Sequence, residues 1–112
     1  MTEQDSIQQM QMIEQNLQNI LMQKQAFQME FSETQSSLKE MKEAKDDVFK
    51  IVGQLMIKTN KDKVKEELES KEKLLDLRIK SLEKQEEKFS EQLSELREKF
   101  LKDKEKDKSL EK

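Results

Sequence analysis

The chain has 112 residues, of which 42% are charged and 32% are hydrophobic, with no proline, cysteine, tryptophan, tyrosine or histidine. This composition excludes a broad globular core and is typical of long helices that share a narrow apolar seam. The 22 basic and 25 acidic side chains are interspersed and give a net charge of −3, so no nucleic-acid partner is expected. Because histidine, cysteine and tyrosine are absent and there is no glycine-rich loop, we expect no enzyme activity, no cofactor and no metal site.

The N-terminal segment lacks the basic region and apolar run of a signal peptide. No stretch approaches the ~20 apolar residues that a membrane-spanning helix needs. The absence of cysteine removes any disulfide framework, which small secreted domains often use. We therefore expect a soluble, cytoplasmic protein without a membrane partner, folded as a single unit over residues 1–112.

The first predicted element is a helix over residues 6–46, with Asp5 or Ser6 as its N-cap. Its apolar residues recur with a period of about 3.5, which predicts the seam of a coiled coil and which a disordered chain would have no reason to keep. Lys24 and Thr34 interrupt this stripe. The stripe consists of Met10, Ile13, Leu17, Ile20, Phe27, Phe31, Leu38 and Met41.

The pattern changes over residues 48–59, where β-branched and aromatic residues flank Gly53 and Gln54. Two such runs joined by two residues predict a β-hairpin, and glycine at the first turn position suits a type II′ turn. Both faces of the ribbon would then be mostly apolar. The expected cross-strand pairs are Val52 with Leu55, Ile51 with Met56, Lys50 with Ile57 and Phe49 with Lys58.

A second helix is predicted over residues 61–104, with Asn60 as its N-cap. Residues 105–112 alternate in charge and carry no apolar stripe, so we expect a frayed polar tail there. The stripe of this helix consists of Leu68, Leu75, Ile79, Leu82, Phe89, Leu93, Leu96 and Phe100.

The two stripes are mirror images of each other, since the residue numbers of facing positions add to 106. The pairs include Met10 with Leu96, Ile13 with Leu93, Phe27 with Ile79 and Leu38 with Leu68. Residues of an antiparallel helical pair that meet in one layer lie equally far from the turn, and the implied pivot falls at Gly53, the single glycine. The predicted fold is therefore dominated by α-helix: a long antiparallel two-helix coiled coil joined by one β-hairpin.

A two-stranded ribbon with two apolar faces and two open edges is marginal in water. The two helices could fold over it within one chain, but they would shield one face at most. The other possibility is that the ribbon joins ribbons of further subunits in a shared sheet or barrel, in which closure removes the open edges. We favour the second arrangement.

The hairpin over residues 48–59 and the following helix start, Lys61-Asp-Lys-Val-Lys-Glu-Glu-Leu68, resemble the beta-class subunits of prefoldin, the GimC chaperone. The resemblance covers essentially the whole chain, and its specific part is residues 48–68. It implies a hexamer of two alpha and four beta subunits in which the hairpins form the barrel. In that scheme the oligomerisation residues are Val48, Phe49, Ile51, Val52, Gly53, Leu55, Met56 and Ile57.

The resemblance also implies the function: an ATP-independent holdase that captures unfolded polypeptides at the far ends of its helices and passes them to a group II chaperonin. Apolar residues crowd those ends, and flexible methionine suits a surface that accepts many shapes. For Met10 and Ile13 an ordinary place in the seam is the alternative. The candidate client-binding residues are Ile7, Met10, Met12, Ile13, Leu17, Leu93, Leu96, Phe100 and Leu101.

The polar residues of the seam are expected to weaken its middle layers. In the mirror register Lys24 faces Leu82 and Glu86 faces Ile20, and such residues fix the register of a coiled coil or soften it. A second function also fits the sequence, namely a structural coiled-coil adaptor that oligomerises through the hairpin and docks one specific folded partner. Suppression of the aggregation of several unrelated proteins would separate the holdase from the adaptor.

Overall fold

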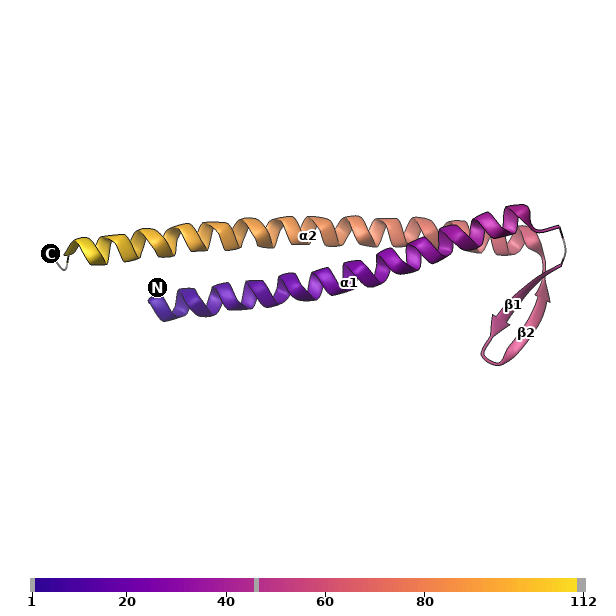
Figure 1. Cartoon of the computed structure of the whole chain (residues 1–112), viewed down its shortest axis with the longest axis horizontal. Helices are drawn as coiled ribbons and strands as arrows, with labels where there is room; N and C mark the ends of the chain where they lie inside the picture. Colours follow the sequence, from indigo (N-terminus) through magenta and orange to yellow (C-terminus); the bar gives the residue numbers. More distant parts are fainter. Residues whose placement is uncertain (1, 46, 111–112) are drawn as a thin grey trace. The chain divides into compact units, whose positions relative to one another are not determined.

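The fold is described by a computed structural model, which covers residues 2–45 and 47–110. Its elements follow in the order α1 (Glu3–Glu43), β1 (Val48–Val52), β2 (Leu55–Thr59) and α2 (Lys61–Leu110). Two long helices joined by a two-stranded antiparallel hairpin were predicted, and the structure confirms this fold (Figure 1).

The N-terminus of α1 is closed by a reciprocal pair of hydrogen bonds between Thr2 and Asp5. The Asp5 backbone N–H donates to the Thr2 hydroxyl oxygen at 3.2 Å, and the Thr2 backbone N–H donates to Asp5 Oδ2 at 3.3 Å. This is a capping box with Thr2 as the N-cap, so the prediction of Asp5 or Ser6 was wrong. Hydrogen bonds to Thr2 lower the pKa of Asp5 below its ordinary value of 3.8. The Thr2 hydroxyl has the larger effect and the Thr2 backbone N–H the smaller one. Their stabilising effect is present above pH 3.8 and is lost as the pH falls through the lowered pKa.

The other helix ends also differ from the expected bounds. α1 ends at Glu43 instead of residue 46, and α2 continues to Leu110 instead of residue 104. Residues 105–110 are thus helical where a frayed tail was expected, because lysine and glutamate favour helix and extending an existing helix costs little. Asp46 and residues 111–112 lie outside the described residues. The predicted N-cap of α2 is confirmed, since Asn60 Oδ1 accepts a hydrogen bond from the Asp62 N–H at 2.8 Å.

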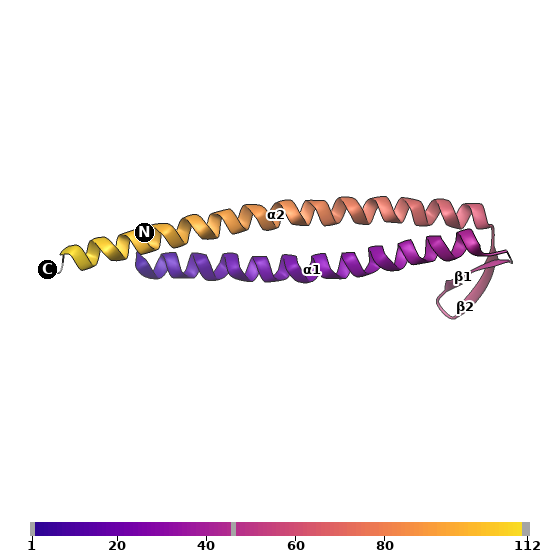
Figure 2. The ribbon, with the colours of Figure 1, turned by 45° about the horizontal axis from the view of Figure 1, so that its top comes forward.

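The chain divides into two compact units, each containing a part of both helices. Unit 1 comprises residues 1–24 and 81–112, and α1 and α2 run antiparallel within it (Figures 1 and 2). Its buried apolar residues are Ile20, Leu82 and Leu93, all taken from the predicted stripes. Two exposed ion pairs cross between the helices, Glu14–Arg97 at 2.8 Å and Glu3–Lys104 at 3.5 Å. The Glu3–Lys104 pair lies close to the predicted mirror register, since its residue numbers add to 107, whereas those of Glu14 and Arg97 add to 111.

The polar layer of unit 1 differs from the expected one. Instead of facing Leu82 and Ile20 separately, Lys24 and Glu86 meet each other: Lys24 Nζ donates to both carboxylate oxygens of Glu86 at 3.2 Å. Long side chains from adjacent layers can bridge diagonally across a seam, which the layer-by-layer register did not take into account.

Unit 2 comprises residues 25–80 and contains the hairpin. Its buried apolar residues are Leu38, Met41, Leu75 and Ile79, again from the two stripes. Thr34 is buried in the same seam, and its hydroxyl donates to the Glu30 carbonyl oxygen at 2.8 Å. The seam of this unit therefore accommodates a polar residue whose hydrogen bond is made within its own helix. The single unit expected over residues 1–112 stays a prediction.

The hairpin has the predicted strands and register. The pairs run from Val48 with Thr59 to Val52 with Leu55, including Ile51 with Met56. Gly53 has a φ of +62°, and no non-glycine residue of the described chain has a positive φ. A positive φ at the first turn position alone is the pattern of a type II′ turn, as predicted.

The seam makes a sharp prediction for two adjacent leucines of α2. Leu75 is 3% exposed and Leu74 is 48% exposed, although they have the same side chain and helical context. Leu75→Ala is expected to lower the free energy of unfolding by about 2–5 kcal/mol, because it removes buried contacts and leaves a cavity. Leu74→Ala should cost less than about 1 kcal/mol. Urea denaturation followed by circular dichroism compares the two, and equal losses would contradict this packing.

Candidate functional site

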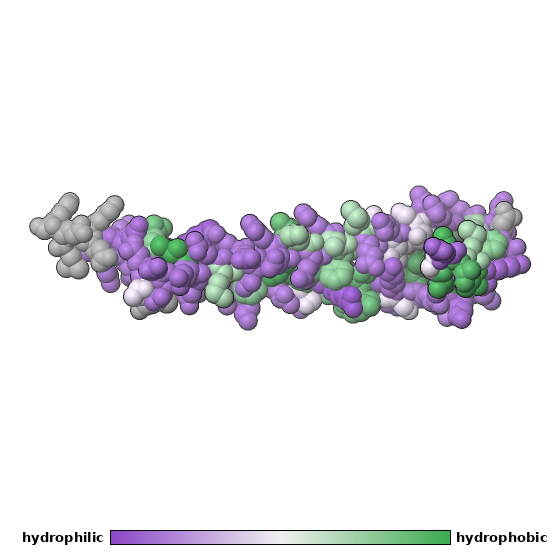
Figure 3. Space-filling view, turned by 90° about the horizontal axis from the view of Figure 1, so that it is seen from below, coloured by the Kyte–Doolittle hydropathy of each residue, from purple (hydrophilic) through white to green (hydrophobic). Residues whose placement is uncertain are grey.

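The hairpin of unit 2 carries a dense group of exposed apolar side chains. They are between 47% and 71% exposed, whereas such side chains are usually buried. Figure 3 shows apolar surface gathered over the hairpin and bordered by polar residues. We call this group the hairpin patch: Phe49, Ile51, Val52, Leu55, Met56 and Ile57.

The patch lies on both faces of the ribbon. Cross-strand partners share a face and successive pairs alternate, so Ile51 and Met56 lie on one face while Val52 and Leu55 lie on the other. The helices of unit 2 leave apolar side chains exposed on both faces, so they do not provide the cover that one of the two interpretations required. Within the described residues no third strand pairs with the ribbon, and both edges are open. An open apolar ribbon of this kind is a candidate association site.

Two exposed ion pairs involve the hairpin, and one of them reaches α2. Lys50 Nζ lies 3.2 Å from Glu67 Oε2 on α2, and Lys58 Nζ lies 3.3 Å from Asp47 Oδ2. Both pairs are well exposed and contribute little to stability. A hollow of about 460 Å³ remains between β1 and the adjoining helix ends, lined by side chains such as Met41, Ile51 and Leu68. The ribbon thus lies beside the helix ends, and its apolar side chains stay exposed.

A second group of apolar side chains lies on unit 1, near the start of α1 and the end of α2. Met12 is 67% exposed, Leu101 is 60% exposed, and Ile7 is exposed to a smaller extent. A hollow of about 490 Å³ between the two helices has Met12, Ile13 and Leu96 in its lining, together with the amides of Gln9, Asn16 and Gln92 and the opposite charges of Glu95 and Lys99. We use the name tip surface for Ile7, Met12 and Leu101 together with the lining of this hollow. It offers apolar contacts without a dominant charge.

The remaining candidate client-binding residues are less accessible. Leu93 is buried in the seam. The half-buried ones are Met10, Ile13, Leu17, Leu96 and Phe100. Their role in client binding stays a prediction.

Several exposed apolar residues were not singled out from the sequence. They are Leu21, Met22, Met29, Leu74 and Leu77. Each falls off the seam stripe of its helix, which is the signal that could have identified them in advance. Exposed apolar residues of this kind are found on most protein surfaces.

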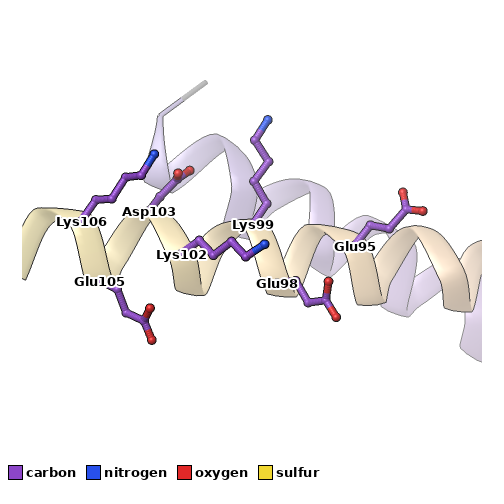
Figure 4. A pocket seen from close by; sticks show the side chains of 7 residues that line it. All are labelled: Glu95, Glu98, Lys99, Lys102, Asp103, Glu105 and Lys106. Carbon is purple, nitrogen blue, oxygen red and sulfur yellow. The ribbon is translucent and has the colours of Figure 1, made fainter.

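The C-terminal part of α2 carries a hollow of about 560 Å³ with a different character. The seven side chains that line it are all charged and include both signs, from Glu95 to Lys106 (Figure 4). Among the described residues no cluster of acidic side chains could hold a metal ion. Over the same residues, neither helix contains an apolar stretch long enough to cross a bilayer.

Comparisons with known proteins agree with this architecture. A crystal structure of the prefoldin beta subunit from Thermococcus strain KS-1 superposes with a TM-score of 0.81 at 37% identity, covering 88% of each chain. Among curated proteins, the prefoldin subunit beta of Thermococcus kodakarensis is 42% identical over 82 residues, which are 71% of this chain and 70% of that protein. The prefoldin subunit beta of Methanosarcina acetivorans is 36% identical over 87 residues, which are 76% of this chain and 74% of that protein.

The family model described as prefoldin subunit matches residues 4–106, which include both helices and the hairpin almost completely. The identity to the two curated beta subunits extends over most of the length of each. The hairpin between two long helices, the exposed apolar ribbon and these matches lead to one assignment: the chain belongs to the prefoldin family of chaperone subunits, and within it to the beta class.

Proposed function

We propose that the chain is one subunit of an ATP-independent holdase that captures unfolded polypeptides and passes them to a group II chaperonin. Prefoldin subunits are chaperone subunits rather than enzymes, and they assemble with other prefoldin subunits. The observation that carries it is the hairpin patch, because apolar side chains on both faces of an isolated ribbon need further protein to cover them.

Assembly is proposed to occur through the hairpin. Its open edges can pair with strands of neighbouring subunits, and its two apolar faces can be buried in the resulting β-barrel platform. The oligomer is proposed to contain two alpha and four beta subunits, with this chain in a beta position. The residues that would be buried are those of the hairpin patch, together with Val48 and Gly53.

Clients are proposed to bind at the tip surface of unit 1. Met12 supplies a flexible, polarizable side chain that adapts to different apolar groups, and Leu101 adds a further exposed contact. One such surface is too small for strong binding. An oligomer would carry several α1–α2 helix pairs, each with its own tip surface. Simultaneous binding of one client by several of these surfaces would raise the overall affinity through multivalency.

The proposal is tested by light scattering with several unrelated denatured proteins and no nucleotide. The chain, assembled with an alpha-class prefoldin subunit, is expected to suppress their aggregation at a near-stoichiometric ratio. Addition of a group II chaperonin with ATP should then release folded client. Suppression for none of the clients would contradict the holdase and leave the adaptor function, in which the tip surface docks one folded partner.

A further inference from the structure

The contact between Lys24 and Glu86 differs from the other ion pairs between the two helices. The Lys24 ammonium donates to both carboxylate oxygens of Glu86 at 3.2 Å, and the side chains are 17% and 33% exposed. The Glu14–Arg97 and Glu3–Lys104 pairs lie on the exposed flanks of the same unit. Lys24 and Glu86 occupy positions where the heptad pattern places apolar residues, and each follows a buried seam residue, Ile20 or Leu82, by four positions in its helix.

We propose that the Lys24–Glu86 pair determines pairing specificity: it makes α1 associate with α2 and disfavours association of α1 or α2 with its own counterpart in a second chain. The two apolar stripes have the same heptad pattern, so burial alone does not distinguish these arrangements. The proposed assembly would bring several helix pairs close together and would make mispairing a real competitor.

The seam positions give the physical reason. In a parallel pair of identical helices, each seam residue meets its own copy. Lys24 would then face a second Lys24 in an α1–α1 pair, and Glu86 would face a second Glu86 in an α2–α2 pair. Like charges held together in a partly dry seam repel each other and lose their partners. Only the α1–α2 arrangement places the ammonium against the carboxylate, as observed.

Thr34 provides an internal contrast. It is also a buried polar residue of the seam, but its hydroxyl is satisfied by the Glu30 carbonyl oxygen of the same helix. That hydrogen bond is the same whichever helix packs against α1, so Thr34 carries no information about the partner. Lys24 obtains its hydrogen bonds from the opposite helix, and its satisfaction depends on which helix is there.

Disulfide trapping in the full chain tests the proposal, because the sequence contains no cysteine. Leu17→Cys places a thiol in the α1 seam, where a disulfide-linked dimer forms if two copies of α1 pair in parallel. In a glutathione redox buffer the dimer fraction should be low with the native pair. It should rise by about tenfold in the Lys24→Leu, Glu86→Leu background, which corresponds to about 1.4 kcal/mol of lost discrimination. Phe89→Cys reports on α2 in the same way.

Two further backgrounds complete the test. The charge swap Lys24→Glu with Glu86→Lys restores opposite charges in the α1–α2 pair and should keep the dimer fraction low. Thr34→Val removes a seam polar group that has no role in partner choice, so the dimer fraction should also stay low in this background. The proposal is overturned if the double leucine variant does not raise the dimer fraction, or if the swap or Thr34→Val raises it equally. The double leucine variant should still fold, since apolar replacement of such pairs is generally tolerated.

Discussion

Replacing Ile51 and Met56 with glutamate is expected to abolish assembly with other prefoldin subunits while leaving the helical content almost unchanged. The two residues are direct cross-strand partners on one face of the ribbon. Each substitution removes about 1.5–3 kcal/mol of apolar burial in the proposed interface. It also adds a charge that burial would leave unpaired, and the two glutamates repel each other across the strands. The association constant should therefore fall by at least about 100-fold.

Sedimentation velocity of the variant mixed with an alpha-class prefoldin subunit measures this loss, and circular dichroism measures the helical content. The matched control is Met29→Glu with Leu77→Glu, which adds the same charge at similarly exposed apolar positions of the helices. The control should assemble normally. Assembly of the hairpin variant to the same extent as the control would remove the hairpin patch from the proposed interface.

Replacing Met12 and Leu101 with serine is expected to produce the opposite phenotype, with assembly retained and client capture lost. Both side chains are exposed, so the substitutions leave the seam intact. The substitutions weaken the tip surface of every copy of this subunit in the oligomer. In multivalent binding the losses of affinity at the individual surfaces multiply. About ten times more chaperone should be needed for the same suppression of aggregation.

Light scattering with two unrelated clients gives this ratio, and the sedimentation coefficient confirms that the oligomer is intact. Met22→Ser with Leu77→Ser is the control, because both are exposed apolar residues away from the tip surface. If the tip variant and the control protect equally well, clients are bound elsewhere on the chain. If neither protects, general surface apolarity rather than the tip would be responsible.

The hairpin shows how far local sequence determines structure. Its register is fixed where a two-residue turn with glycine at the first position meets two runs of β-formers, and each of the predicted pairs is present. The seam was predictable for a similar reason. A heptad stripe specifies which face of a helix is buried, and Ile20, Leu75 and Leu82 are all found there.

The start of α1 could have been predicted but was not. The Thr2-x-x-Asp5 spacing is a capping-box signal, and it lies several residues before the apolar stripe begins at Met10. The end of α2 is a different case. Its alternating charges give no stripe, and a pattern without a stripe cannot distinguish an extended helix from a frayed tail.

The sequence by itself determined the elements, the hairpin register and the buried stripes, because these depend on periodicity and on turn chemistry within a few residues. The tertiary structure alone decided that Lys24 meets Glu86 and that the ribbon is left uncovered by its helices. These outcomes depend on the reach of side chains between segments far apart in the chain. No local pattern encodes that reach.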